Sequence, residues 1–262
     1  MNDGAPLRGR AAVITGGGRG VGAAIAQRLA SAGAAVLVAA RTEAQIEQVA
    51  AGLRDAGHTA HAVTCDVGDE SSVQHLALTA RDWLGHVDIL VNNAGIAASA
   101  PIHKTTLDAW TRMLTVNATG AFLCLKAFLP DMLERGWGRV VNMASVAGLG
   151  ADRYIAAYAA SKHALVGLTR AAAAEVAARG VTVNAVCPGY LHTDMTRETI
   201  ARIVRVTGRS EEAALEELLR RVPQRRLIEP EEVAEMVAFL CFDAARGITG
   251  ESVVIDGGEL RR

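Results

Sequence analysis

Tyr158 and Lys162 have the residue types and the spacing that proton transfer requires. Residues four positions apart lie on one face of an α-helix, so the phenol hydroxyl and the ammonium group can converge on one point. A cation beside a phenol favours the phenolate, and we therefore expect Lys162 to lower the pKa of Tyr158 from about 10 toward neutrality. A phenol with such a pKa can both donate and accept a proton.

Ser145 lies thirteen residues upstream of Tyr158 and follows a predicted strand. Its hydroxyl group can donate a hydrogen bond to a substrate oxygen as negative charge develops there. The alternative is a serine that only ends a strand and forms a turn. We predict the first role, in which the serine helps to hold the substrate for hydride attack.

The segment TGGGRGVG, residues 15–22, follows a predicted strand and opens a predicted helix. Here Gly16 permits a tight turn, Gly20 lets the backbone approach a pyrophosphate, and Gly22 allows the helix to pack closely on the strand. The spacing G-x-x-x-G-x-G differs from the G-x-G-x-x-G of most dinucleotide-binding folds, and glycine-rich turns also serve purely structural purposes. Together with the tyrosine, the turn indicates hydride transfer to or from a carbonyl group.

Short β-branched segments alternate with segments of helical periodicity along the chain. This alternation predicts an α/β, doubly wound Rossmann fold, in which a seven-stranded parallel sheet carries helices on both faces. No repeat or linker divides the pattern, so residues 1–262 are expected to form a single Rossmann-type domain. The predicted strands are Ala11–Thr15, Ala35–Ala39, Ala60–Thr64, Ile89–Asn92, Arg139–Met143, Thr182–Val186 and Ser252–Ile255. The predicted helices are Val21–Ser31, Glu43–Ala56, Glu70–Leu84, Leu107–Arg135, Ala159–Ala178 and Glu231–Phe242.

Residues 194–226 form the one segment outside this alternation, and they are charged and partly helical. In open α/β sheets, ligands bind beyond the carboxyl ends of the strands, where this segment would project. We predict that it is a lid over the substrate. The alternative is a solvated excursion at the surface.

Composition and charge favour small-molecule partners. The hydrophobic fraction of 50% is ample for a core, and a formal net charge of −1 offers no global attraction for nucleic acid or an anionic membrane. Four cysteines without paired spacing are expected to be reduced core residues, and no histidine pattern predicts a metal site. No apolar segment at the N-terminus resembles a signal sequence, no uninterrupted apolar run is long enough for a membrane span, and we expect a cytoplasmic protein.

The chain resembles the short-chain dehydrogenase/reductase family over nearly its whole length. The residues that carry this resemblance are Thr15 with Gly16–Gly22, Asp66 and Val67 after the third strand, Asn92–Gly95 after the fourth, Asn117, Ser145, Tyr158, Lys162, Pro188, Gly189 and Thr193. The resemblance implies a ketone/alcohol oxidoreductase that uses a nicotinamide coenzyme.

Several residue roles follow from this resemblance alone. It implies that Lys162 also binds the nicotinamide ribose and that Asn117 kinks a helix and holds a water linked to the lysine. It further implies that Asp66 binds the adenine amine and that Thr193 meets the carboxamide. Asp66 could equally cap a turn, and Asn117 could be a plain surface residue. The expected coenzyme contacts are Gly16, Gly18, Arg19, Gly20, Val21, Gly22, Arg41, Thr42, Asp66, Val67, Asn93, Ala94, Gly95, Tyr158, Lys162, Pro188, Gly189 and Thr193.

The end of the second strand indicates which coenzyme is bound. An NAD-preferring protein usually places an acid there for the ribose 2′-hydroxyl, and this chain has Ala40 followed by Arg41. Arg41 and Arg19 can clamp a 2′-phosphate with charge-assisted hydrogen bonds, so we predict NADP(H). Glu43 lies two residues beyond Arg41 and keeps NAD(H) as the alternative.

The sequence identifies the substrate less specifically than it identifies the coenzyme. The expected substrate contacts are Ser145, Tyr154, Tyr190 and Met195, among mostly small apolar residues. Residues 132–135, 161–163, 184–189 and 232–238 resemble aromatic polyketide ketoreductases and 3-oxoacyl-thioester reductases. Residues 96–99 lack the extra glycines of the polyketide enzymes, so small free or cyclic ketones and alcohols remain an alternative. A non-catalytic NADP(H)-binding sensor is a more distant alternative.

Self-association is predicted from the helix Ala159–Ala178. Small residues recur along it at Ala160, Ala164, Gly167 and Ala171, and such a stripe lets another helix approach closely. Packing of this stripe against the sheet is the alternative. The family resemblance favours a homotetramer.

Overall fold

Strands and helices alternate in the computed structural model, which describes residues 5–260. The strands are β1 (Ala11–Thr15), β2 (Ala35–Ala40), β3 (Ala60–Thr64), β4 (Ile89–Asn92), β5 (Gly138–Met143), β6 (Val181–Pro188) and β7 (Ser252–Ile255). The main helices are α1 (Gly20–Ser31), α2 (Glu43–Asp55), α3 (Glu70–Leu84), α4 (Leu107–Leu114), α5 (Gly120–Arg135), α6 (Ala156–Val176), α7 (Asp194–Thr207), α8 (Glu211–Leu219) and α9 (Pro230–Cys241).

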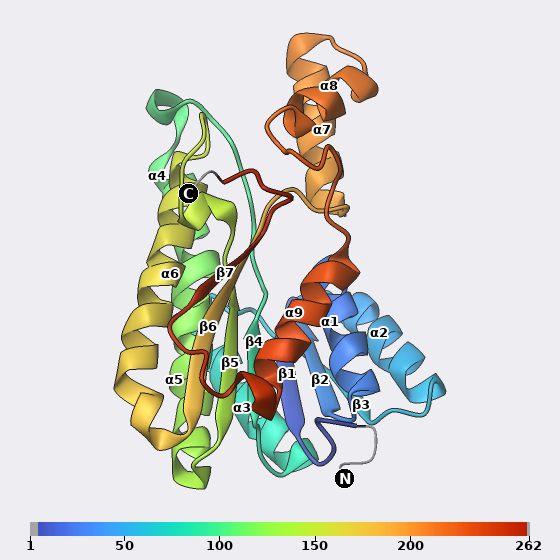
Figure 1. Ribbon diagram of the computed structural model, residues 1–262, viewed down its shortest axis with the longest axis vertical. Coiled ribbons are helices and arrows are strands. Elements are labelled where there is room, and N and C mark those ends of the chain that lie inside the picture. The colour runs from blue at the N-terminus through green and yellow to red at the C-terminus, as the bar shows by residue number, and fades with distance from the viewer. Residues whose placement is uncertain (1–4, 261–262) are drawn as a thin grey trace.

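The seven strands form one parallel sheet in the order β3-β2-β1-β4-β5-β6-β7 (Figure 1). The chain first moves outward from β1 to β3 and then crosses to β4, on the other side of β1. This reversal opens a crevice beyond the carboxyl ends of β1 and β4, where doubly wound folds bind ligands. The predicted fold class is confirmed.

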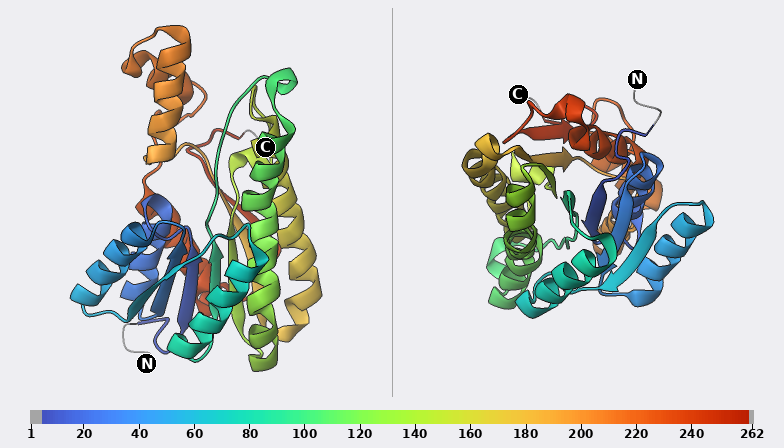
Figure 2. Two further views of the ribbon diagram at one scale, coloured as in Figure 1. Left: turned by 180° about the vertical axis from the view of Figure 1, so that it is seen from behind. Right: turned by 90° about the horizontal axis from the view of Figure 1, so that it is seen from below.

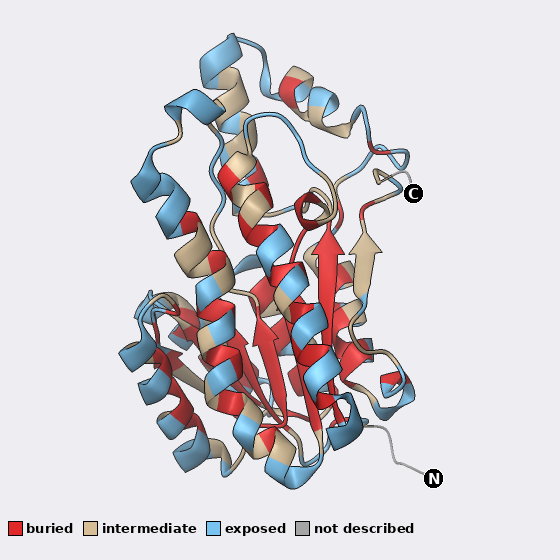
Figure 3. Ribbon diagram, turned by 90° about the vertical axis from the view of Figure 1, so that its left-hand side faces the viewer, coloured by how far each residue is buried: buried red, intermediate tan, exposed pale blue. Residues whose placement is uncertain are grey.

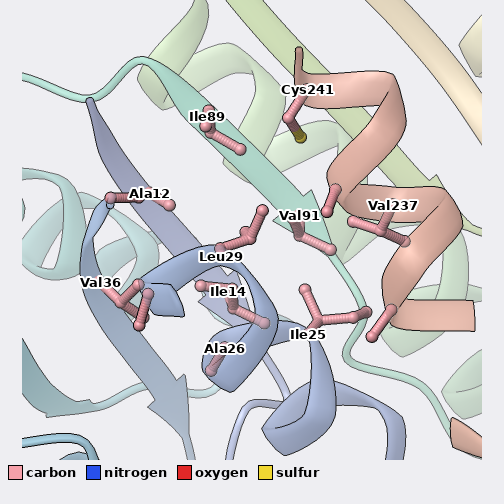
Figure 4. Packing of buried hydrophobic residues seen from close by; sticks show 14 of the residues in the cluster. Ala12, Ile14, Ile25, Ala26, Leu29, Val36, Ile89, Val91, Val237 and Cys241 are labelled. Carbon is pink, nitrogen blue, oxygen red and sulfur yellow. The ribbon is translucent and has the colours of Figure 1, made fainter. Parts of the chain in front are cut away.

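Each strand of the sheet contributes side chains to two cores, because successive residues of a strand point to opposite faces. Ala12 and Ile14 of β1 belong to one core with residues of α1 and α9, as Figure 4 shows, whereas Val13 belongs to the other. Helices α1, α2 and α9 cover the first face, and α3, α5 and α6 cover the second (Figure 1, Figure 2). Strands β1, β4, β5 and β6 are buried along their length (Figure 3).

The predicted helix over residues 107–135 is interrupted. A π-helical turn, η2 (Thr115–Thr119), separates α4 from α5 and contains Asn117. By length and composition alone this stretch could cross a membrane, because an 18-residue window within it has a mean hydropathy of 1.3. Its apolar residues Phe128 and Met132 are instead almost fully buried in the core beneath α5. The buried face of α5 therefore belongs to the core of the protein, whereas other apolar residues of the stretch, such as Phe122 at 48% exposed, lie at the surface.

The predicted lid contains two helices, α7 and α8, which project beyond the carboxyl edge of the sheet (Figure 1). The four cysteines, Cys65, Cys124, Cys187 and Cys241, are all buried thiols, as the sequence predicts.

The amino ends of β5 and β6 approach each other closely at two glycines, Gly136 and Gly180. Gly136 and Gly180 both have positive φ, 65° and 73°. A β-carbon on Gly180 would overlap the carbonyl oxygen of Gly136, whereas one on Gly136 meets nothing within 4 Å.

Gly136→Ala should therefore lower the free energy of unfolding by about 1 to 2 kcal/mol, the cost of the left-handed backbone. Gly180→Ala should cost ~1 to 3 kcal/mol more, because overpacking is added.

Urea unfolding of both variants and the wild type measures the two costs. Equal losses of unfolding free energy in the two variants would show that backbone conformation alone determines the cost. In that case the two turns can move apart at no cost in stability.

Candidate active site

A cleft with a volume of about 300 Å³ lies at the crevice beyond β1 and β4. The turn at residues 15–22 forms one side of it, and Asn93 joins that turn to β4. The side-chain nitrogen of Asn93 donates to the carbonyl oxygens of Thr15 and Gly16, both at 3.0 Å. The hydroxyl oxygen of Thr15 accepts hydrogen bonds in return from the backbone N–H groups of Asn93 and Ala94, both at 3.1 Å. Asn93 thus fixes the glycine turn from behind.

The glycines of this turn fit a bound pyrophosphate. A β-carbon on Gly22 would overlap the carbonyl oxygen of Gly16, so close packing of α1 requires glycine at position 22. Gly20 has a φ of 53°, and a β-carbon there would meet only Thr193 at 3.5 Å. The backbone of Gly20 therefore borders open space at the start of α1, where a helix N-terminus favours an anion.

The cleft brings together nearly all of the predicted coenzyme contacts. Gly189 is the exception, because it lines the neighbouring cavity instead. Asp66 lies in the cleft, and its carboxylate also accepts from the backbone N–H of Gly68 at 3.0 Å, so it forms the turn that was the alternative for it. The adenine contact stays a prediction. The predicted contacts that line the cleft are Gly16, Gly18, Arg19, Gly20, Val21, Gly22, Arg41, Thr42, Asp66, Val67, Asn93, Ala94, Gly95, Tyr158, Lys162, Pro188 and Thr193.

Arg19 and Arg41 are both exposed at the rim of this cleft. Arg41 forms no ion pair with any residue that the structure describes, whereas Nη1 of Arg19 contacts the carboxylate of Asp194 at 3.3 Å. Asp194 also binds Arg197, one turn along α7. This link between the glycine turn and the lid was not predicted, since the two partners are 175 positions apart. An anion bound at Arg19 would compete with Asp194 for the guanidinium group.

Lys162 carries its amine into a buried part of α6. The residue is 5% exposed, and Nζ donates to the carbonyl oxygen of Met143, at the end of β5, at 2.7 Å. Nζ lies 5.8 Å from the centroid of the Tyr158 ring. Burial lowers the pKa of Lys162 to about 8. The lysine can therefore exchange a proton near neutral pH.

The pKa of Tyr158 differs from the sequence-based expectation. Burial raises it, and a hydrogen bond from Ser145 opposes this shift without reversing it. The expectation of a lowered pKa was wrong for the protein without coenzyme, because it counted the charge of the lysine and not the removal of water from the phenol. Tyr158 is accordingly protonated, which is the state of a proton donor.

Ser145 is held beside Tyr158 by the loop after β5. The serine is 9% exposed, and its hydroxyl oxygen accepts from the backbone N–H of Ala147 at 3.1 Å. Gly148 lets this loop pack directly on α6, because a β-carbon there would lie 2.8 Å from the carbonyl oxygen of Lys162. Gly148 was not predicted as a site residue, since its role depends on a contact with a different element.

Asn117 is buried in the π-helical turn, not exposed at the surface. Its side-chain oxygen accepts from the backbone N–H of Ile96 at 2.8 Å, and its nitrogen donates to the carbonyl oxygen of Ile96 at 2.9 Å. The same nitrogen contacts the hydroxyl oxygen of Ser161 at 3.0 Å. The helix irregularity implied by the family resemblance is present. The side chain, however, is occupied in fixing the loop after β4, and a water near Lys162 stays a prediction.

A second cavity, of about 250 Å³, adjoins the coenzyme cleft and shares Tyr158 with it. Ser145, Tyr190 and Met195 line this cavity, as predicted for substrate contacts. Burial raises the pKa of Tyr190 to about 12, and the nearby carboxylates of Glu259 and Asp152 add to the shift. Tyr154 is not among the lining residues: the structure places it at the surface, 59% exposed, with a φ of 69°.

Among residues 5–260, no group of three or more His, Cys, Asp or Glu side chains is arranged to hold a metal ion.

Comparisons with known proteins agree with this architecture. A family model described as enoyl-(acyl carrier protein) reductase matches residues 16–259. A cis-4-hydroxycyclohexanecarboxylate dehydrogenase of Sinomonas cyclohexanicum is 42% identical over 250 residues, which are 95% of this chain and 96% of that protein. A D-beta-hydroxybutyrate dehydrogenase of Rhizobium meliloti is 37% identical over 254 residues, or 95% of this chain and 98% of that protein.

A solved structure is similar over the same extent. A variant of actinorhodin polyketide ketoreductase, crystallised with NADPH, is 38% identical and superimposes with a TM-score of 0.92 over 95% of this chain and 97% of that one. Sequence, fold and family model therefore agree, and the chain is a nicotinamide-dependent oxidoreductase that belongs to the short-chain dehydrogenase/reductase family.

Proposed function

We propose that this protein is an NADP(H)-dependent oxidoreductase that interconverts a ketone and a secondary alcohol, with Tyr158 as general acid and base. One observation carries the proposal: Tyr158 lines both the coenzyme cleft and the second cavity, so it lies where a coenzyme and a substrate would meet. Ser145 lies beside it in the second cavity, and Lys162 lies on the side of the coenzyme cleft.

The residues of the chain divide the proton chemistry between them. Bound NADPH supplies a hydride to the carbonyl carbon. Tyr158 gives its hydroxyl proton to the carbonyl oxygen, and Ser145 donates a hydrogen bond to the same oxygen as its charge grows. Lys162, with a pKa of about 8, then favours the return of a proton to the phenolate, and its charge stabilises that phenolate in the meantime. Alcohol oxidation uses the same groups in reverse.

NADP(H) is proposed over NAD(H) because the cleft presents guanidinium groups where the ribose would lie. Arg19 and Arg41 both line it, and Ala40 stands at the end of β2 where an acid would favour NAD(H). The similar ketoreductase crystallised with NADPH supports the same choice.

A 3-oxoacyl-thioester or polyketide-like ketone is the proposed substrate. The support is the similarity to the actinorhodin polyketide ketoreductase, and the matching enoyl-(acyl carrier protein) reductase family model is named for thioester-linked substrates as well. A small cyclic or free ketone is the second candidate, and the cis-4-hydroxycyclohexanecarboxylate dehydrogenase, at 42% identity, favours it. A panel of thioesters and free ketones, assayed with both coenzymes, separates the two. NADPH binding without turnover of any of them would indicate a non-catalytic sensor.

Tyr158→Phe should retain the fold and NADPH binding but lose the proton donor. Turnover should fall at least ~10² to 10⁴-fold, the usual contribution of general acid catalysis. Stopped-flow measurement of NADPH oxidation, with NADPH titration as the control for binding, makes the comparison. Turnover close to that of the wild type would exclude the tyrosine from the mechanism.

Ser145→Ala should lower kcat by ~10² or more if the serine hydroxyl stabilises charge on the substrate oxygen. A change confined to KM would show that Ser145 only binds the ground state.

Arg41→Ala should weaken NADPH binding by about ten- to a hundredfold, since a hydrogen bond to a charged group contributes ~1.5 to 3 kcal/mol. NADH binding should hardly change, because NADH has no 2′-phosphate. Fluorescence titration with both coenzymes measures the effect, and Arg246→Ala, an exposed arginine outside the cleft, is the control. A loss equal for the two coenzymes would mean that Arg41 does not contact the phosphate.

We also propose a homotetramer. Ala164, Gly167 and Ala171 on α6 are exposed in the single chain and do not pack on the sheet. Gly167→Glu should reduce the assembly in sedimentation analysis at micromolar concentration, because the new side chain would block helix contact. Gly52→Glu on α2 is the matched control, since neither glycine has an atom within 4 Å of its β-carbon position. A wild-type monomer would refute the proposal.

A further inference from the structure

One face of α7 forms a wall of the second cavity. Met195, Thr199 and Arg202 recur on it at helical spacing and all line the cavity. Met195 also lines the coenzyme cleft, so this face begins beside the coenzyme. Arg202 lies seven residues further on, about 10 Å along the helix axis at 1.5 Å per residue. The contact of Arg202 with Ser99 places its guanidinium group in the wall of the cavity that Tyr158 also lines.

Arg202 is half-buried and has no carboxylate partner. Its Nη1 donates to the carbonyl oxygen of Ser99 at 3.1 Å and to the Ser99 hydroxyl at 2.9 Å, and Ser99 lines the cavity as well. Within residues 5–260, no carboxylate oxygen approaches the guanidinium within 4.0 Å, and Nε and Nη2 make no hydrogen bond. The cavity therefore contains a positive charge that is held in place and not neutralised by the protein.

The other charged groups around the cavity differ from Arg202. Arg221 is neutralised by Asp152 at 2.7 Å. Glu259 is half-buried, burial raises the pKa of its carboxyl group, and it lies more than 4.0 Å from the guanidinium group of Arg202. Glu198 lies one turn before Arg202 on α7, but it is exposed to water and lies more than 4.0 Å from the guanidinium. Water screens the charge of Glu198 more than that of the half-buried arginine.

We propose that Arg202 binds an anionic group of the substrate, and that the enzyme prefers ketones bearing such a group on the side of the reacting carbonyl that faces α7. This inference rests on the proposed function. A carboxylate of a free oxo acid and the phosphate of a pantetheine arm share the required chemistry, because both accept two hydrogen bonds from one guanidinium. Arg202 is thus a specificity-determining residue contributed by the lid.

Matched ketones test the preference. Wild-type enzyme should reduce 4-oxocyclohexanecarboxylate with a kcat/KM about ten- to a hundredfold higher than that for its methyl ester. Arg202→Gln should remove this advantage mainly through KM, because the contact is distant from the reacting atoms. Arg202→Lys should retain part of it. Arg205→Gln, an exposed arginine outside the cavity on the same helix, is the control for net charge and should leave the advantage intact.

A second pair of substrates identifies the source of the anion. Acetoacetyl phosphopantetheine carries a phosphate, and the acetoacetyl thioester of N-acetylcysteamine carries none. A loss in Arg202→Gln confined to the phosphopantetheine thioester assigns the arginine to the pantetheine arm. A loss confined to the oxo acid assigns it to a substrate carboxylate.

Either equal losses for charged and neutral substrates, or no loss for any charged substrate, would overturn the inference. Turnover of the neutral ester by wild type, and its abolition in Tyr158→Phe, reports on the proposed function separately. Calorimetric titration of 4-oxocyclohexanecarboxylate and its methyl ester into the NADP⁺-loaded protein gives a readout without turnover. If the acid binds no more tightly than the ester, or if Arg202→Gln leaves its affinity unchanged, the inference fails even where catalysis succeeds.

Discussion

The amine of Lys162 lies in a part of the protein from which water is almost excluded, and the site is built around this constraint. A charge there is costly, so the pKa of the lysine falls to about 8, and the charged form depends on the carbonyl oxygen of Met143. That oxygen is available because β5 ends at Met143 and no strand continues beyond it. A β-carbon at Gly95 would lie 3.3 Å from the side-chain oxygen of Asn117, so glycine at this position avoids a tight contact beside the site.

The same burial governs the tyrosine. Removing water raises the pKa of Tyr158, so the phenol stays protonated until charge develops next to it. The pKa of Tyr158 is raised and the pKa of the neighbouring Lys162 is lowered, so the tyrosine keeps its proton at neutral pH. In this arrangement the lysine acts on the phenolate once it forms, and less on the resting phenol. Ser145, whose hydrogen bond favours the phenolate, acts in the same direction as the lysine.

Much of this arrangement could be predicted from the sequence, because local patterns determine it. The bounds predicted for β1, β3, β4 and β7 match the structure, and the spacing of Tyr158 and Lys162 placed both on one helix. The rest depends on contacts between distant elements. The helical periodicity of the sequence predicted one uninterrupted helix through Asn117. The π-helical turn was missed because contacts of Asn117 with Ile96 and Ser161 stabilise it, and periodicity does not reveal such contacts. The shift of the tyrosine pKa was predicted with the wrong sign because burial cannot be read from two residues. Nothing local distinguished Tyr154, at the surface, from Tyr190, in the cavity.

The residues that transfer the proton and the residues that contact the substrate lie in segments that differ in burial. Residues that handle the proton come from β5, its following loop and α6, which are packed against the core and cannot change without disturbing it. The loop after β5 and the segment after β6 also line the outer cavity, but its other lining residues come from α7, the loop after β4 and the C-terminal segment, where most side chains are exposed or half-buried. A substitution on α7 can therefore alter the charge presented to a substrate at little cost in stability. If Arg202 binds a substrate anion as proposed, the substrate preference of this chain is set on α7, apart from the residues that handle the proton.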